Sequence, residues 1–156
     1  MMLRSEMTNP EQRPRTEEGA ALRITLGRNP LAPSRARAAV AGFSMQRRIS
    51  PAGLDTLSLL VSELVSNAVV HSDAPAASAI ELCARQPAPD SVRVEVTDQG
   101  SGFTAMTRDP DRQDGGYGLL LVESQATRWG IDRRFGNCVW FEIVDRDLSG
   151  EHIDTI

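Results

Sequence analysis

Three polar residues, Glu63, Asn67 and His71, recur at every fourth position of an otherwise apolar segment. In a helix, this spacing places the three side chains in one stripe. The stripe lies beside Leu60 and Leu64 at the boundary of the core, where an unpaired carboxylate or amide is costly. One interpretation is the ordinary polar face of an amphipathic helix. The other is an oxygen-donor site, in which the Asn67 carbonyl binds Mg²⁺ and Glu63 acts as a base.

Asp98 follows a segment in which valine occupies every second position from 92 to 96. Alternate residues of a strand share one face, so Asp98 continues the face that points into the core. A carboxylate there needs hydrogen-bond donors, and the exocyclic amine of a ligand would supply one. Gly100 and Gly102 would let the backbone approach a planar ligand closely. Asp-x-Gly-x-Gly is also a common turn sequence, which is the alternative interpretation.

A second glycine segment, Gly115-Gly-Tyr-Gly118, precedes an apolar run that predicts a helix from Leu119 to about Ala126. Glycine loops at helix amino termini bind phosphate, because unpaired amides and the helix dipole point at the anion. The chain contains no lysine, and all 17 of its basic residues are arginine. This composition excludes a Walker A lysine, the strand lysine of protein kinases and Schiff-base chemistry.

The elements that must position these residues follow from hydrophobic periodicity. Alternation predicts strands at 21–26, 77–85, 92–96, 129–134 and 138–143, with a loop at 86–90 and a hairpin turn at 135–137. Helical spacing predicts helices from Ser34, from Pro51 after an N-cap at Ser50, and from Leu119. Strands joined by short turns are antiparallel. We therefore expect an α+β fold, a two-layer sandwich with helices on one face of a mixed, mostly antiparallel sheet.

The composition fits one globular domain. We expect a disordered leader at 1–20, the domain at 21–145 and a flexible acidic tail at 146–156. The leader lacks the apolar segment of a signal peptide, and no apolar run approaches the length of a membrane span, so we expect a cytoplasmic protein without a membrane partner. The net charge of −4 argues against direct binding of nucleic acid. Cys83 and Cys138 are expected to be free thiols.

The segment between Gly19 and Leu54 has no acidic residue, and it contains six arginines. A solvated surface is the ordinary interpretation of such a stretch. A docking surface for an acidic partner is the alternative. The six are Arg23, Arg28, Arg35, Arg37, Arg47 and Arg48.

Taken together, the three motifs resemble those of the GHKL ATPases, the superfamily of gyrase, histidine kinases and MutL. Residues 62–71 (SELVSNAVVH) resemble the N-box, residues 98–103 (DQGSGF) the G1 box, and residues 116–119 (GYGL) the G2 box. The small size, the first strand and helix, and the closing strands resemble anti-sigma-factor serine/threonine kinases of the RsbW/SpoIIAB type. The resemblance spans about residues 22–143 and implies the Bergerat fold.

The resemblance implies a role for each residue of the first two motifs. Glu63 would be the catalytic base that takes the proton of an attacking serine hydroxyl. Asn67 would coordinate the Mg²⁺ ion between the phosphates of ATP. Asp98 would bind the adenine amino group, in a pocket that Gly100 and Gly102 shape.

The third motif would contact phosphate through Gly116, Gly118 and Leu119. Between the second and third motifs, residues 104–114 are short for an ATP lid and carry three aspartates. His71 matches a histidine of some family members, although a residue that caps the helix end explains it equally well.

The resemblance also implies the partners of the protein. An anti-anti-sigma protein of the STAS type would accept the phosphoryl group on a serine, and a sigma factor would be bound or released in a partner switch that regulates transcription. A homodimer is expected, with the first strand and helix as the contact region. The alternative is a non-catalytic interaction module on the same fold, with weak or no turnover of ATP.

Overall fold

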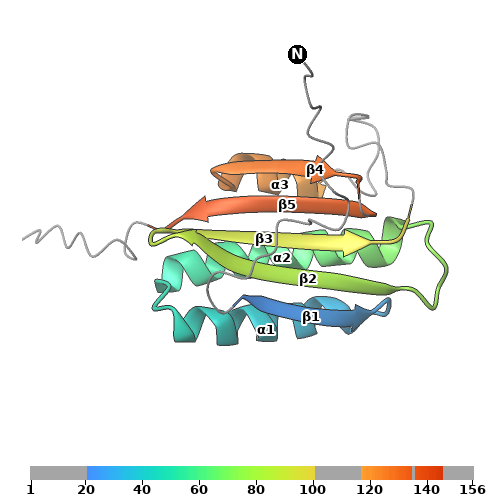
Figure 1. Cartoon of the computed structure of the whole chain (residues 1–156), viewed down its shortest axis with the longest axis horizontal. Helices are drawn as coiled ribbons and strands as arrows, with labels where there is room; N and C mark the ends of the chain where they lie inside the picture. Colours follow the sequence, from blue (N-terminus) through green and yellow to red (C-terminus); the bar gives the residue numbers. More distant parts are fainter. Residues whose placement is uncertain (1–20, 101–116, 135, 146–156) are drawn as a thin grey trace, which may run out of the picture.

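The computed structural model describes residues 21–100, 117–134 and 136–145 (Figure 1). The elements in chain order are β1 (Leu22–Gly27), α1 (Ala32–Gln46), α2 (Pro51–His71), β2 (Ala79–Ala88), β3 (Ser91–Asp98), α3 (Tyr117–Gln125), β4 (Arg128–Asp132) and β5 (Asn137–Val144). This succession of strands and helices is the one that the periodicity predicts.

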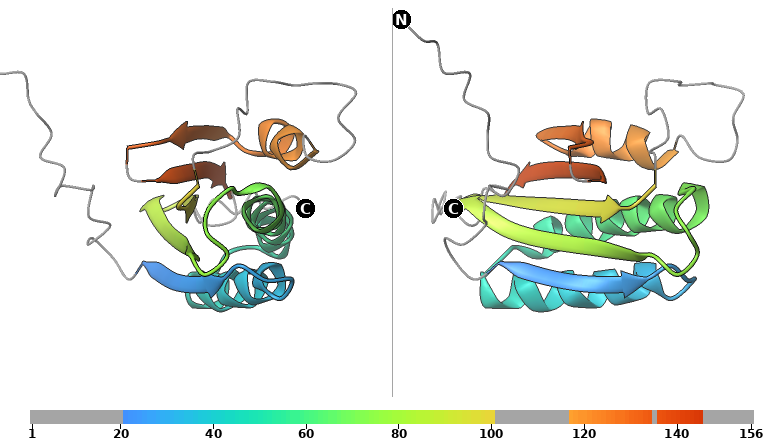
Figure 2. Two further views of the ribbon diagram at one scale, coloured as in Figure 1. Left: turned by 90° about the vertical axis from the view of Figure 1, so that its right-hand side faces the viewer. Right: turned by 45° about the vertical axis from the view of Figure 1, so that its right-hand side comes forward.

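The five strands form one open sheet in the order β1-β2-β3-β5-β4. The three helices lie on one face, with α2 between α1 and α3 (Figure 1), and Figure 2 shows the sheet and the helices as two layers. The predicted α+β sandwich is therefore confirmed. All four strand pairings are antiparallel, so the parallel pairing of a mixed sheet is not found among these strands. β3 and β4, which the α3 crossover connects, run in the same direction and would form a parallel pair if they were neighbours. β5 lies between them and pairs antiparallel with both.

The core lies between the two layers and is built from alternate strand residues and one stripe of α2. Valines 92, 94 and 96 of β3 are at most 3% exposed, as their spacing predicts. Facing side chains from the other elements complete the core. They include Leu57, Leu60, Val61, Leu64, Ile80, Leu82, Val139, Phe141 and Ile143.

By length and composition, α2 is apolar enough to cross a membrane, contrary to the expectation that no segment reaches that length. The position of α2 in the fold accounts for this composition. As the middle helix it contacts the sheet and both other helices, and a helix covered on several sides is apolar around much of its circumference. The residues that make α2 apolar therefore contribute to the core.

β2 extends to Ala88, whereas the sequence predicts a loop over residues 86–90. The pairing of β2 with β3 is irregular between Arg85 and Ala88. Pro87 lies within this interval, and a proline cannot donate a ladder hydrogen bond. The alternation of apolar residues ends before the strand does, and this is why the prediction stopped at Arg85.

The amino end of α2 is fixed by Ser50 and Asp145. The N-cap prediction is confirmed, because Ser50 Oγ accepts a hydrogen bond of 3.0 Å from the Gly53 amide. The carboxylate of Asp145 in turn accepts from the Ser50 amide at 2.7 Å and from Ser50 Oγ at 2.9 Å. A negative charge thus lies at the positive end of the helix dipole, and it ties the chain after β5 to α2.

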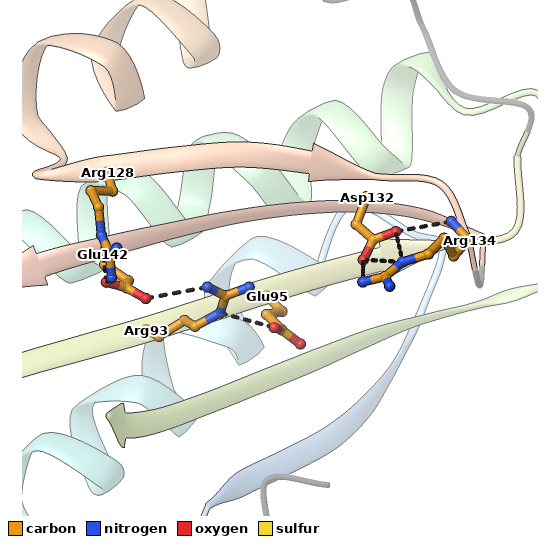
Figure 3. Close-up of polar contacts among 6 residues, drawn as sticks. All are labelled: Arg93, Glu95, Arg128, Asp132, Arg134 and Glu142. Atoms are coloured by element: carbon orange, nitrogen blue, oxygen red, sulfur yellow. Dashed lines mark hydrogen bonds and ion pairs between the residues drawn. The ribbon is translucent and has the colours of Figure 1, made fainter. Parts of the chain in front are cut away.

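The sheet face opposite the helices carries a polar network across β3, β5 and β4 (Figure 3). Glu142, 7% exposed, accepts hydrogen bonds from Arg128 and, at 3.2 Å, from Arg93. Arg93 also pairs with Glu95 at 3.0 Å, and its guanidinium lies 4.0 Å from the ring centroid of Trp140. Burial alone would raise the pKa of Glu142, but the hydrogen bonds from Arg128 and Arg93 lower this pKa below its ordinary value.

The lowered pKa of Glu142 predicts a specific loss of stability in acid. A carboxyl group whose pKa is lower in the folded state stabilises the fold fully above its unfolded pKa of about 4.3, and this contribution is lost as the pH falls through the folded pKa. In urea unfolding between about pH 5 and pH 3, Glu142→Gln should therefore show a smaller decrease of the unfolding free energy than the wild type.

Asp132→Asn is the control for this prediction. Asp132 pairs with Arg134 at 2.7 Å on the surface, where the two side chains are 31% and 63% exposed. Hydrogen bonds from Arg134 lower the pKa of Asp132 as well, but solvent screens this surface pair, so Asp132→Asn should change the acid dependence less than Glu142→Gln does. A Glu142→Gln protein with the same acid dependence as the wild type would contradict the assignment.

Candidate functional site

The chemistry-bearing residues lie at one end of the molecule. The carboxyl ends of β1, α2 and β3 meet there with the amino end of β5 (Figure 1). In the sheet, the last residue of β3, Asp98, is paired with the first residue of β5, Asn137. Asn67 lies near the end of α2, so the first two motifs reach this end from the two layers of the fold.

Asp98 is 4% exposed, so the prediction that it faces inward is confirmed. Its Oδ1 accepts hydrogen bonds from Ser72 Oγ at 2.9 Å and from the Gly100 amide at 2.7 Å. Its Oδ2 accepts from Asn137 Nδ2 at 3.3 Å. We call these four residues the Asp98 corner. An ionised carboxylate offers about four acceptor positions. The three donors fill three of them, so about one acceptor position remains, on Oδ2.

Asn137 adds a second acceptor to the Asp98 corner. It is 2% exposed, and its Oδ1 is buried without a hydrogen-bond partner among the described residues. Rotation of the amide by half a turn would set an oxygen against the Asp98 carboxylate, so the observed orientation is the favourable one. A buried acceptor without a donor costs about 1–3 kcal/mol. The Asp98 corner thus contains two acceptor atoms whose capacity the described residues do not fill, Asp98 Oδ2 and Asn137 Oδ1.

Sequence analysis assigned Asn137 only to a hairpin turn. The signal that identifies it is the strand register, which places it opposite Asp98. That hairpin is confirmed by the pairing of β4 with β5. Gly136 has a φ of +101°, and a Cβ there would lie 2.8 Å from the Asp98 carbonyl oxygen, so glycine is required for the strands to meet at this point.

Asn67 is 8% exposed, and its Nδ2 is buried with no partner in the part of the chain that the structure describes. A solvated helix face does not describe this residue, since its amide is held out of water. Glu63 is half-buried one turn earlier in α2, and His71 is exposed at the helix end. Within the described residues no group of three or more His, Cys, Asp or Glu could hold a metal ion. The atom of Asn67 without a partner is an NH₂ donor, so its burial fits a hydrogen bond to an acceptor of a ligand, whereas a metal ion would be bound through Oδ1.

Gly100 lies where a side chain would collide with the corner. A Cβ at this position would lie 2.6 Å from Ser72 Oγ, 2.7 Å from Asp73 Oδ1 and 2.8 Å from Asp98 Oδ1. The sequence predicts that this glycine admits a ligand. In the structure, the absence of a side chain at Gly100 lets the polar side chains of Ser72, Asp73 and Asp98 lie close to its backbone, and this packing holds the Asp98 carboxylate in place.

The third motif is only partly within the described residues. Gly102, Gly116 and the expected lid at 104–114 lie outside them. Gly118 is the second residue of α3, which starts two positions earlier than predicted, and Leu119 is 9% exposed and packs in the core. The first four amides of a helix have no partner within the helix, so the start of α3 has amides to offer an anion. The phosphate-binding role of this loop stays a prediction.

The cysteines are free thiols, as predicted. Burial raises the pKa of the Cys138 thiol to about 11. This thiol is therefore protonated at neutral pH, and Cys138 lacks the thiolate character of a catalytic nucleophile.

Residues 29–143 match the family model described as the histidine kinase-like ATPase domain. The match includes Glu63, Asn67, Asp98 and Asn137. A comparison with curated protein sequences gives no match.

Solved structures share the fold, and three of them illustrate the similarity. The RsbU and RsbW domains of Rv1364c from Mycobacterium tuberculosis match with a TM-score of 0.64 and 21% identity, over 81% of this chain and 32% of that one. A blue-light activated histidine kinase of Erythrobacter litoralis matches with a TM-score of 0.51 and 20% identity, over 81% of this chain and 44% of that one. The histidine kinase domain of that protein matches with a TM-score of 0.50 and 19% identity, over 76% of this chain and 63% of that one. The chain spans less than two thirds of each.

The crowding at Gly100 predicts opposite effects for two glycine substitutions. Gly100→Ala should lower the free energy of unfolding by about 1–3 kcal/mol, because the new methyl group displaces the corner. Gly42→Ala is the matched control, since a Cβ on this exposed residue of α1 meets nothing within 4 Å. That change should stabilise the fold by about 0.5–1 kcal/mol. Equal effects of both substitutions in urea unfolding would show that the corner tolerates a side chain.

Proposed function

The chain belongs to the family of histidine kinase-like ATPase domains, and on this premise we propose that it is a Mg·ATP-dependent serine/threonine protein kinase of a regulatory circuit. Membership of an ATPase family establishes a nucleotide-binding domain. The identity of the base, the metal ion and the acceptor is the proposed part.

The observation that carries the proposal is the pair of buried acceptors in the Asp98 corner. The amino group of adenine has two hydrogens and accepts none in return. Asp98 Oδ2 has about one acceptor position left, and Asn137 Oδ1 has no partner within residues 21–100, 117–134 and 136–145. An amine with two hydrogens can satisfy both atoms. A carbonyl at the same ring position, as in guanine, would add a third oxygen to a site that already lacks donors.

The residues on α2 are suited to the other end of the nucleotide. Asn67 would hold Mg²⁺ through its amide oxygen, because Mg²⁺ takes few protein ligands and completes its shell with phosphate oxygens and water. Glu63, half-buried one turn earlier, would accept the proton of a serine hydroxyl as that oxygen bonds to phosphorus. Bound ATP would supply the phosphoryl group and leave as ADP. Gly100, Gly102, Gly116, Gly118 and Leu119 would line the base and phosphate regions.

The proposed partners rest on resemblance. One of the structural matches is to the RsbU and RsbW domains of Rv1364c, in which an RsbW domain occurs together with an RsbU domain. We infer a partner switch, in which this protein phosphorylates a serine of a STAS-type anti-anti-sigma protein and binds a sigma factor. A cytoplasmic homodimer is part of the same proposal.

A non-catalytic interaction module on this fold is the second candidate. The segment at 104–114 favours it, because this short stretch carries three aspartates that would repel a triphosphate. Such a module would bind its partner whether or not Glu63 is intact.

Calorimetric titration with ATP tests the proposal. The wild type should bind ATP in a Mg²⁺-dependent manner, and Asp98→Ala should weaken binding about 10- to 100-fold, because a hydrogen bond to a charged group is lost. Glu63→Ala is the matched control, since this residue would act in transfer and not in binding. It should keep the wild-type affinity and lose phosphorylation of a STAS-type substrate. A folded wild type that binds no ATP at millimolar concentration would contradict the kinase assignment.

A further inference from the structure

Arg28 lies in the loop after β1 and binds the carboxyl end of α2. Its Nη2 donates hydrogen bonds to the carbonyl oxygens of Ser72 at 2.9 Å and Val69 at 3.4 Å. Its Nη1 donates to the carbonyl oxygens of Ala74 and, at 3.2 Å, Pro75. One guanidinium thus joins four main-chain acceptors that lie 41 to 47 positions further along the chain.

The end of α2 needs such a partner. The last carbonyls of a helix have no partner within the helix, and a glycine with positive φ is the usual means of satisfying them. Here Ser72 follows the helix with an extended backbone, at a φ of −70° and a ψ of 135°, and neither it nor Asp73 has a positive φ. A cation at this end also interacts favourably with the helix dipole. Arg28 therefore takes the place of a glycine cap.

The carbonyls that Arg28 holds flank the side chain that supports Asp98. Ser72 Oγ donates to Asp98 Oδ1 at 2.9 Å and accepts from the Ala74 amide at 3.1 Å. The carbonyl oxygens of Ser72 and Ala74 are both bound by Arg28. Ser72 Oγ and Asp98 Oδ1 both lie against Gly100, at 2.6 and 2.8 Å from the position that its Cβ would take.

Arg28 shows no sign of being an ordinary surface charge. Among the described residues it forms no ion pair, and its Nε is buried without a partner. The side chain is partly buried and gives its donors to carbonyls alone. A lysine could not replace it, since an ammonium is a compact charge that cannot spread over four acceptors in the plane of a guanidinium.

We propose that Arg28 is a positioning residue for base recognition, which sets the distance between Ser72 and Asp98 by clamping the end of α2 to the loop after β1. This inference rests on the proposed binding of ATP. Its consequence concerns selectivity: without the clamp, the Asp98 carboxylate is no longer held where an adenine amine would meet it.

The test is the ratio of affinities for ATP and inosine triphosphate, which has an oxygen in place of the amine. Wild type should prefer ATP at least about 10-fold, since the difference is one hydrogen bond to a charged group. Arg28→Ala should reduce this preference at least about 5-fold in titrations run well below its melting temperature. Arg37→Ala is the control, because Arg37 donates one exposed hydrogen bond, to Ser62 Oγ at 2.9 Å, and this variant should keep the preference.

If Arg28 only caps the helix, Arg28→Ala should have a lower melting temperature while the folded protein keeps the wild-type preference for ATP. That result would overturn the inference. If Arg28→Ala does not fold, Arg28→Lys decides the matter, because it keeps the charge at the helix end and should still lose part of the preference. Ser72→Ala should reproduce the loss with the cap intact, and an unchanged preference in this variant would also overturn it. A wild type that binds neither nucleotide would instead refute the proposed function.

Discussion

The carboxylate of Asp98 is held on the inner face of the sheet, where burial removes it from water and protein donors must replace the lost hydration. Each donor imposes a condition on the fold. Ser72 must follow α2 at the level of the last residue of β3, Asn137 must begin β5 directly opposite, and Gly100 must lack a side chain. A buried charge is strongly destabilising when its partners are removed, so these conditions act together. The residues that form the site are therefore the same ones that join α2, β3 and β5.

The helix α2 connects this corner with the rest of the molecule. Its apolar residues fill the core, while Asn67 and Glu63 lie on the same helix at different depths. Both helix ends are held by residues that are distant in sequence, Asp145 at the amino end and Arg28 at the carboxyl end. A negative and a positive charge thus lie at the matching ends of the helix dipole. The helix that would carry the metal ligand and the base is therefore fixed in position along its axis.

What could be predicted from the sequence is what depends on local periodicity. The alternation of valines predicts that Asp98 faces inward, and the spacing on α2 predicts which side chains enter the core. Ser50 is identified as a cap from its neighbours in sequence alone. These features are encoded within a few residues, so the order of elements and the two-layer fold could be derived before the structure.

The remainder depends on contacts between residues that are far apart in sequence. Asn137 lies 39 positions from Asp98, and Asp145 lies 95 positions from Ser50. Such pairs follow from strand order and register, which no local pattern specifies. Arg28 was one of six arginines in an acid-free stretch, and only its position beside the end of α2 distinguishes it. For the same reason, the antiparallel character of every strand pairing required knowledge of where β5 lies.

The central claim is that a nucleotide binds with its base at the Asp98 corner and its phosphates toward Asn67, and the side-chain amides of Asn67 and Asn137 report on it directly. We would record ¹H–¹⁵N spectra of the labelled protein during addition of Mg·ATP, with Mg²⁺ alone and with the side-chain amide of Gln86, near the carboxyl end of β2, as references. We predict that the side-chain NH₂ signals of Asn67 and Asn137 shift together and saturate at one nucleotide per chain, while that of Gln86 shifts much less. Saturable binding that leaves both signals unchanged would place the nucleotide elsewhere and contradict the account.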